Sequence, residues 1–357
     1  MKKENIFVSM SGGVDSSLAA ALLKKQGHNV TGITIKLWCY ETKPDTEKAC
    51  CSLQAVNDAK EVAHSLNIPH YVWNMEKDFR KTVLETFCSE YMSGHTPNPC
   101  VLCNAKLRFD IMLNRCLNMG ADAMATGHYA QIRFLSDQNR YALFKGMDNT
   151  KDQSYFLCGI PAGKLQNIRF PLGNITKKET RTLAKSFGLK TSEKKESQDL
   201  CFAAEGKYSD ILKELYDKPF QPGEIRNSRD NLLGTHKGLC FYTIGQRRGL
   251  GIAAGHPLYV TGLEAKNNIL RVGCENELFS KDFAVSNINW FDPITFKKTI
   301  ECSVSIRSTH KGSPALIEWT NTQTIKVSFK EPQRSISPGQ SAVFYDNNEL
   351  LGGGIIQ

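Results

Sequence analysis

The sequence contains no apolar run approaching the roughly 18 residues that a membrane-spanning helix requires, so we expect no integral membrane protein. Internal repeats and low-complexity linkers are also absent. The first four residues lead directly into a predicted strand, which leaves no room for a signal or transit peptide. Together these absences predict a cytoplasmic protein.

The residues that are present make an ordinary globular composition, with 41% hydrophobic and 23% charged residues in a chain of 357. This composition excludes a disordered, collagen-like or fibrous protein, and the length suggests two or three domains. The formal net charge of +9 is compatible with a polyanionic partner without demonstrating one.

The first 130 residues alternate short apolar runs with amphipathic segments, which is typical of a parallel sheet flanked by helices. The pattern predicts helices over residues 16–26, 53–66 and 107–117. It predicts strands over residues 6–9, 30–35, 70–73 and 123–126. We therefore expect a doubly wound α/β domain over residues 1–204.

The pattern changes after Ala130, where residues 131–134 and 141–144 predict a hairpin. Further on, Thr176 to Glu179 fits a helix capping box. Beyond residue 205, helical periodicity fades and short strands separated by Gly, Asn and Pro predict small β-barrels. These strands are expected at residues 241–244, 258–261, 269–272, 303–306, 324–329 and 342–345. We expect two β-rich domains, at residues 205–275 and 276–357.

The segment Ser11-Gly12-Gly13-Val14-Asp15-Ser16-Ser17 lies between the first predicted strand and its helix. Its glycines allow backbone amides to turn toward an anion, its hydroxyls add donors, and the helix N-terminus contributes positive charge. The lysine of the G-x-x-x-x-G-K-[ST] loop is missing. An anion bound here would be recognised mainly by amides and hydroxyls, although a tight turn with a serine cap is the structural alternative.

Twelve cysteines in a chain without an export signal indicate reduced, catalytic, metal-binding or buried thiols rather than a disulfide framework. Cys100 and Cys103 form a C-x-x-C stiffened by Pro97 and Pro99, just ahead of a predicted helix. A helix N-terminus lowers the pKa of a thiol, which favours nucleophilicity or metal binding. No second C-x-x-C or H-x-x-x-H follows to complete a zinc site. Cys201 is the third notable thiol.

The heptad SGGVDSS resembles the PP-loop of the ATP pyrophosphatase superfamily, whose members cleave ATP between the α and β phosphates. With the cysteine segments, the chain closely resembles tRNA-specific 2-thiouridylases of the MnmA type. The resemblance extends over most of the chain, through three further segments: ATGHY at 125–129, KDQSYF at 151–156 and GLCFYTIGQRRGL at 238–250.

The resemblance implies ATP-dependent replacement of O2 of the wobble uridine in tRNA by sulfur, with Mg²⁺ as an expected cofactor. It implies Cys103 as the nucleophile and Cys201 as the persulfide carrier, supplied by a sulfur-relay or persulfide donor protein. The nucleotide-binding residues that it implies are Ser9, Met10, Ser11, Gly12, Gly13, Val14, Asp15, Ser16, Ile35 and Gly127. The implied tRNA-binding residues are Asn98, Pro99, Cys100, Lys151, Asp152, Gln153, Arg307 and Ser308.

Two positions depart from the family pattern. Many members have Asp, a candidate general base, where this chain has Cys100, and many have an aromatic residue where it has Ser308. The first departure leaves a second sulfur route open, in which Cys100, Cys103 and Cys201 hold an iron-sulfur cluster through three thiolates. Without an aromatic ring at 308, base stacking there is not expected.

Two other functions stay open on the sequence alone. One is another ATP pyrophosphatase activity, such as an amide-forming ligase or a thiolase acting elsewhere on RNA. A ligase would need neither Cys103 nor Cys201. The other is an RNA-binding or redox-sensing protein with a vestigial nucleotide loop, which would bind tRNA without consuming ATP.

The remaining residues of interest have both structural and functional interpretations. Core packing is the expected role of Cys88, Cys116, Cys158, Cys240 and Cys302, whereas Cys39, Cys50 and Cys51 lie in a polar stretch that suits either a loop or a metal site. His128 follows a predicted strand, where ligands gather in doubly wound sheets. Arg247, Arg248 and Lys311 are suited to phosphate contact.

Overall fold

The computed structural model describes residues 2–37, 53–194, 201–202, 208–216, 219–291 and 299–357. Packing divides the chain into two compact units. Unit 1 comprises residues 1–83, 100–207 and 348–350, and unit 2 comprises residues 84–99, 208–347 and 351–357. None of the helices in these described ranges is long and apolar enough to cross a membrane.

A parallel sheet forms the centre of unit 1, with the strand order β3-β2-β1-β4-β7 in the described residues. Its strands are β1 (Asn5–Ser9), β2 (Asn29–Lys36), β3 (His70–Asn74), β4 (Ala123–Ala125) and β7 (Ile168–Arg169). The chain runs from β1 to β2 and β3 on one side, then returns to β4 on the other side of β1. The order therefore reverses between β1 and β4, and this doubly wound arrangement confirms the predicted α/β class.

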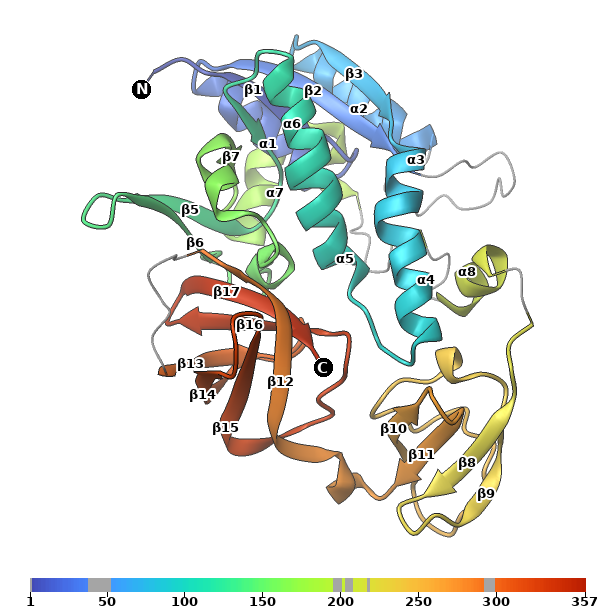
Figure 1. The fold of residues 1–357 in the computed structure, drawn as a ribbon. Helices are drawn as coiled ribbons and strands as arrows, with labels where there is room; N and C mark the ends of the chain where they lie inside the picture. The colour runs from blue at the N-terminus through green and yellow to red at the C-terminus, as the bar shows by residue number, and fades with distance from the viewer. Residues whose placement is uncertain (1, 38–52, 195–200, 203–207, 217–218, 292–298) are drawn as a thin grey trace. The chain divides into compact units, whose positions relative to one another are not determined.

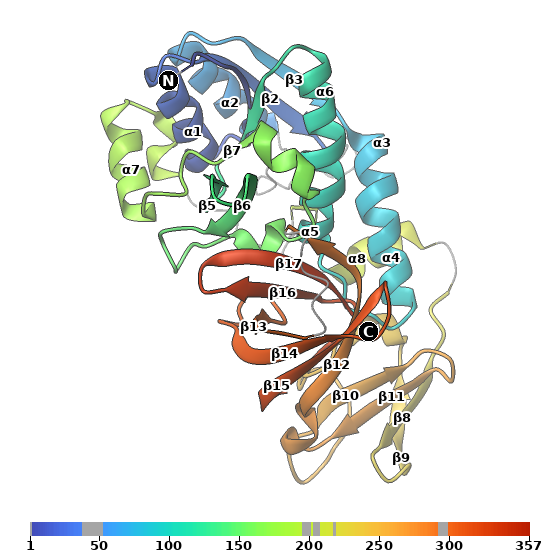
Figure 2. The same ribbon diagram turned by 60° about the vertical axis from the view of Figure 1, so that its left-hand side comes forward.

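Three helices of unit 1 share one hydrophobic core against this sheet: α1 (Val14–Lys25), α2 (Leu53–Ser65) and α7 (Lys177–Ser186). Ile6 and Val8 of β1, Leu18 of α1 and Ala184 of α7 are completely buried in it. Figure 2 shows α7 beside α1. This core holds the start of α1 at the carboxyl end of β1.

A second helical run connects β3 to β4 (Figure 1). It comprises α3 (Glu76–Phe79), the π-helical η2 (Arg80–Leu84), α4 (Glu85–Met92), α5 (Pro99–Leu102), the π-helical η3 (Cys103–Met112) and α6 (Leu113–Asn118), of which α4 belongs to unit 2. In unit 1 the run packs back on the sheet, where the Arg115 guanidinium lies 4.1 Å from the centre of the Trp73 ring. The connections from β1 to β2 and from β2 to β3 cross the sheet in one direction, and the connection from β3 to β4 crosses it in the other. Since such crossovers are right-handed, α6 lies on the face of the sheet opposite α1 and α2.

The predicted hairpin is confirmed as β5 (Ala130–Leu135) and β6 (Arg140–Lys145). The first residues of β17 (Glu349–Ile356) extend it, with Leu350 opposite Leu143. An ion pair of 2.6 Å between Arg140 and Glu349 closes this contact. Unit 1 also contains, in its described residues, the 3₁₀ segments η4 (Ser154–Leu157), η5 (Ala162–Asn167) and η6 (Lys190–Glu193).

Unit 2 contains a four-stranded sheet in the order β10-β11-β8-β9, preceded by α8 (Tyr208–Leu215). Its strands are β8 (Gly223–Asn227), β9 (Leu232–His236), β10 (Tyr259–Glu264) and β11 (Ile269–Gly273), with the 3₁₀ turn η8 (Leu239–Phe241) between β9 and β10. Ile225, Val260, Leu270 and Val272 form its core.

The rest of unit 2 is an antiparallel barrel, drawn in orange to red in Figure 1. Its strands are β12 (Phe279–Trp290), β13 (Thr299–Ser305), β14 (Ser313–Trp319), β15 (Thr324–Arg334), β16 (Ser341–Asp346) and β17, and the 3₁₀ segment η9 (Glu275–Leu278) precedes them. Pairing of β12 with β17 closes the barrel around Val304, Val327 and Phe344. The expectation of β-barrels after the α/β domain is confirmed.

One predicted strand, residues 241–244, is wrong, because the chain there forms η8 followed by irregular backbone and a turn. Gly238 and Gly245 flank the segment with φ of +140° and +88°, which are left-handed conformations that interrupt a strand. The apolar run that suggested a strand instead contributes Leu239 and Tyr242 to the core.

The capping box at the start of α7 is confirmed: the Thr176 hydroxyl accepts from the Glu179 amide at 3.2 Å, and the Glu179 carboxylate accepts from the Thr176 amide at 2.7 Å. Since N-cap residues contribute about 1 kcal/mol, Thr176→Ala should lower the free energy of unfolding by about that amount in urea denaturation. Thr182→Ala, on an exposed position of the same helix, is the control and should change it by less than about 0.5 kcal/mol. Equal losses in both variants would contradict the role of the cap.

Candidate functional site

The phosphate loop joins the end of β1 to the start of α1, as predicted. Gly13 is the N-cap residue and provides no side-chain cap, so the first-turn amides of α1 have no partner within the helix. Hydrogen bonds within the loop hold its shape: the Ser16 and Ser17 hydroxyls donate to the Gly13 carbonyl at 3.2 and 2.8 Å. Met10 and Val14 have buried side chains, so these two can offer an anion only their backbone.

Two glycines allow the backbone to approach closely at this loop. Gly12 has φ of +69°, and a Cβ there would lie 2.2 Å from the Ala55 carbonyl oxygen at the start of α2. At Gly127, which follows β4, a Cβ would lie 2.7 Å from the Ser16 amide nitrogen. The turn after β4 therefore lies directly against the first turn of α1, and Gly127 is required for that contact.

Asp15 in the first turn of α1 is bound from two directions. The Lys177 ammonium of α7 lies 2.7 and 2.8 Å from its two carboxylate oxygens. The Tyr129 hydroxyl lies 2.7 Å from Asp15 and 2.9 Å from the Thr180 hydroxyl. The negative charge of Asp15 is thus neutralised inside the protein, and Asp15 fixes the loop to α7. Sequence analysis did not identify Lys177 or Tyr129, because no short motif links them to the loop.

Cys100 and Cys103 lie within a helix rather than just ahead of one, which corrects the prediction. Pro99 occupies the first position of α5, where its missing N–H costs nothing, and the helix starts there rather than at residue 107. Cys103 then begins the π-helical η3. Both thiols are partly exposed and neither forms a disulfide.

The helix that carries Cys103 is attached to two other parts of unit 1. The Asn104 side-chain amide, which is buried, donates to the Phe156 carbonyl at 3.1 Å. One turn later, the Arg108 guanidinium donates to the Ser9 hydroxyl at 2.9 Å. The helix of Cys103, the nucleophile candidate, is therefore hydrogen-bonded to the strand that leads into the phosphate loop.

Asp152 and Gln153, expected to contact tRNA, use their side chains to shape the loop after β6. Asp152 accepts from the Gly146 amide at 2.9 Å and from the Ser154 hydroxyl at 2.8 Å. Gln153 accepts from the Tyr129 amide at 3.0 Å. These contacts give both residues a positioning role, and they connect the Lys151–Gln153 segment to the tyrosine that binds Asp15.

His128 is surrounded by Phe109 and Phe170, with its Nδ1 atom 2.6 Å from the Thr126 hydroxyl. Burial, together with the nearby Arg108 charge, lowers the pKa of His128 to about 3. The imidazole is therefore neutral at physiological pH, although its edge keeps some exposure. It can hydrogen-bond to a ligand but is not a proton donor near neutrality.

Cys201 lies in unit 1, is partly exposed and forms no disulfide. The next residue, Phe202, packs edge-on against Phe79 with ring centres 5.8 Å apart. On the other side of Cys201 in sequence, the Lys194 ammonium donates to the Gly12 carbonyl at 3.1 Å and pairs with Asp58. Lys194, the last described residue before Cys201, is thus bound to the phosphate loop.

Most of the other cysteines have the structural role that was expected. Cys88, Cys116, Cys158 and Cys240 are buried, and Cys302 is half-buried. Burial raises the pKa of Cys116 to about 12 and that of Cys240 to about 11, so these thiols stay protonated. Cys39, Cys50 and Cys51 lie outside the described residues.

Within the described residues, no group of three or more His, Cys, Asp or Glu side chains is arranged to hold a metal ion. Cys100, Cys103 and Cys201 are all described, so the structure does not assemble them as a ligand set.

Asn98, Pro99, Arg307 and Ser308 belong to unit 2. The Arg307 guanidinium donates to the Arg334 carbonyl at 3.0 Å, while Ser308 and Lys311 are exposed. Arg247 and Arg248 are also exposed and make no ion pair with any described residue. Their charges remain available to an anionic partner.

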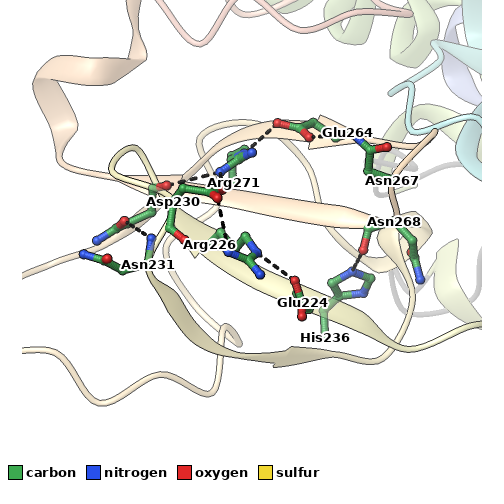
Figure 3. Close-up of polar contacts among 10 residues, drawn as sticks. Glu224, Arg226, Asp230, Asn231, His236, Glu264, Asn267, Asn268 and Arg271 are labelled. Atoms are coloured by element: carbon green, nitrogen blue, oxygen red, sulfur yellow. Dashed lines mark hydrogen bonds and ion pairs between the residues drawn. The ribbon is translucent and has the colours of Figure 1, made fainter.

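Other arginines of unit 2 are already neutralised, as Figure 3 shows for the sheet of β8, β9, β10 and β11. Arg226 pairs with Glu224 at 2.7 Å, and Arg271 pairs with Asp230 at 2.8 Å and with Glu264 at 2.6 Å. Each guanidinium would lose a carboxylate partner on binding phosphate. The charges of these arginines are therefore already compensated by carboxylates within the sheet.

Three family models match successive parts of the chain: the tRNA methyl transferase HUP domain at residues 4–205, the tRNA methyl transferase PRC-barrel domain at 209–274 and the aminomethyltransferase beta-barrel domain at 280–356. A tRNA-specific 2-thiouridylase MnmA of Acetivibrio thermocellus is 42% identical over 100% of both chains. Those of Carboxydothermus hydrogenoformans and Geotalea uraniireducens are 43% and 44% identical, over 99% and 100% of this chain and 98% and 96% of theirs. The chain belongs to the tRNA-specific 2-thiouridylase family.

In this 2-thiouridylase the HUP domain is the ATP-using part, and the phosphate loop fits that role. The first-turn amides, the serine hydroxyls and the glycine backbone converge at the carboxyl end of β1. Asp15 supports this arrangement, and its ion pair with Lys177 neutralises a negative charge that would otherwise repel the phosphates.

The Lys177–Asp15 pair should stabilise the protein more than an exposed pair does. Lys177 is buried, whereas the control pair Lys190–Glu61 has both side chains more than half exposed. Because a partly buried charge that loses its partner is costly, Lys177→Met should lower the free energy of unfolding by about 1–3 kcal/mol, and Lys190→Met by less than about 1 kcal/mol. Urea denaturation measures both, and similar values for the two variants would refute this ranking.

Proposed function

We propose that this enzyme uses ATP to thiolate C2 of the wobble uridine (U34) in tRNA, with Cys201 carrying the sulfur as a persulfide. The proposal is supported above all by one observation, the hydrogen bond from Arg108 to Ser9, which joins the helix of Cys103 to the phosphate loop. Nucleotide chemistry and thiol chemistry are thereby connected within unit 1.

The proposed reaction has two stages. First, O2 of the uracil attacks the α-phosphate of ATP, pyrophosphate leaves, and the weakly electrophilic C2 now carries a good leaving group. Next, the terminal sulfur of the Cys201 persulfide attacks C2, and AMP leaves with the former O2. Cys103 thiolate then attacks the Cys201 sulfur, which breaks the persulfide S–S bond, leaves the outer sulfur on C2 and forms a Cys103–Cys201 disulfide. An external thiol reductant restores both thiols.

Cys100 stands where many family members have Asp, and we propose that the chain is a C-x-x-C variant of the family. A buried or paired Asp could act as a base, whereas Cys100 is partly exposed at the second position of α5. The uracil proton is then taken by water or by another group. We favour the persulfide over an iron-sulfur cluster because Cys100, Cys103 and Cys201 do not form a metal-binding group in the structure.

Mg²⁺ is proposed to enter with the ATP phosphates rather than to occupy a protein site. Magnesium usually keeps several waters and takes substrate phosphates as ligands, and Asp15, the acidic residue of the loop, is already paired with Lys177. When bound, the ion would offset phosphate charge.

We propose that tRNA is contacted by Asn98, Pro99, Cys100, Lys151, Asp152, Gln153, Arg307 and Ser308, as the family resemblance suggests. The boundaries near residues 205 and 275 are likewise proposals, which divide the chain into a catalytic domain and two tRNA-binding domains. Since the target base must leave its stack to reach the phosphate loop, the base should be flipped out. A protein persulfide donor and a tRNA substrate both favour a cytoplasmic location.

The proposal predicts that purified enzyme, given ATP, Mg²⁺, a persulfide source and unmodified tRNA under anaerobic conditions, forms 2-thiouridine. Mass spectrometry of digested nucleosides measures it. Cys103→Ala and Cys201→Ala should each abolish the product, because Cys201 carries the transferred sulfur and Cys103 is the thiol that releases it onto C2. Cys158→Ala removes a buried thiol and is the matched control that keeps activity.

Pyrophosphate release without 2-thiouridine would contradict the assigned acceptor and favour another pyrophosphatase reaction. Bound iron and acid-labile sulfide that disappear together with activity in Cys100→Ala would contradict the persulfide route.

A further inference from the structure

The phosphate loop is short of positive charge. The heptad SGGVDSS contains no lysine or arginine. Among the described residues, two lysines reach the loop: Lys177 is paired with Asp15, and Lys194 is paired with Asp58 and bound to the Gly12 carbonyl. A cation without a carboxylate partner would add charge-assisted hydrogen bonds to those that the loop amides offer a bound triphosphate and the adenylate formed from it.

Arg108 has this property. Its guanidinium donates one hydrogen bond to the Ser9 hydroxyl, and within the described residues no carboxylate is within ion-pairing distance of it. Arg108 is only half-buried. A guanidinium has five N–H donors in a planar fork that matches phosphate oxygens, so donors remain for a ligand.

Arg108, on η3, lies near the edge of the parallel sheet where ligands bind in doubly wound folds. Ser9 ends β1, and His128 follows β4, which lies next to β1 on its other side. The charge of Arg108 contributes to the lowered pKa of His128, so Arg108 lies near the carboxyl ends of both strands. The strand order reverses between these two strands, and doubly wound sheets bind their ligands in the crevice at that reversal.

The π-helical form of η3 relates Arg108 to the thiol. In a π-helix the backbone hydrogen bonds join residues five apart, and Arg108 is five residues after Cys103. Arg108 therefore lies about one turn after Cys103 on η3, and this helix is bound to the end of β1 through Arg108.

We propose that Arg108 binds the α-phosphate of ATP and stays bound to this phosphate after the phosphate has become part of the AMP group on the adenylated uridine. This inference rests on the ATP site of the proposed function. It makes η3 a helix with two roles: Cys103 at its start serves sulfur transfer, and Arg108 one turn later holds the leaving group beside it.

Calorimetric binding of ATP, AMP and adenosine tests this without any thiolation reaction. Loss of a charge-assisted hydrogen bond from a guanidinium should weaken ATP and AMP binding by about tenfold to a hundredfold in Arg108→Met. Adenosine binding should be unchanged, because adenosine has no phosphate. Arg108→Lys keeps the charge without the fork and should be intermediate.

Lys106→Met is the matched control, since Lys106 is exposed on the same helix and carries the same charge. It should bind all three ligands like the unmodified enzyme.

Unchanged ATP and AMP affinities in Arg108→Met would overturn the proposal, as would an equal loss for adenosine. If Arg108→Met does not fold, Arg108→Lys and Arg108→Gln give the same comparison of phosphorylated and unphosphorylated ligands. Failure of the unmodified enzyme to bind ATP is a different result, which would refute the proposed function itself.

Discussion

The ion pair between Asp15 and Lys177 is the interaction on which the site depends. Asp15 lies in the first turn of α1, so its position determines where the phosphate-loop amides point. Lys177 and Tyr129 hold it from α7 and from the turn after β4, and Gly127 lets that turn approach the same helix. A carboxylate in an anion-binding loop would repel phosphate, and neutralisation by a buried lysine removes that conflict.

The thiol chemistry is attached to this loop through backbone and side-chain contacts rather than by sequence proximity. Arg108 connects the Cys103 helix to Ser9, and Lys194 connects the chain that leads to Cys201 to Gly12. Phe202 packs on Phe79 on the other side of Cys201. Burial raises the pKa of Cys116, Cys240 and Cys302, so these thiols stay protonated, whereas the proposed catalytic thiols Cys103 and Cys201 are partly exposed.

Local patterns in the sequence predicted much of this structure. The strands of the parallel sheet, the hairpin at residues 130–145, the capping box at Thr176 and the phosphate loop each depend on residues a few positions apart. The contacts made by Lys177 and Arg108 join residues 162 and 99 positions apart, so no local pattern reveals them. The helical start at Pro99 and the irregular backbone at 241–244 were mispredicted because proline and glycine conformations override apolar periodicity.

The central claim is that uridine O2 is adenylated before sulfur enters. tRNA labelled with ¹⁸O at C2 of the target uridine tests it in a single turnover with ATP and the persulfide donor. If O2 attacks the α-phosphate, the label must appear in AMP, in an amount equal to the 2-thiouridine formed. Recovery of the label in water, or formation of ADP in place of AMP, would contradict the account.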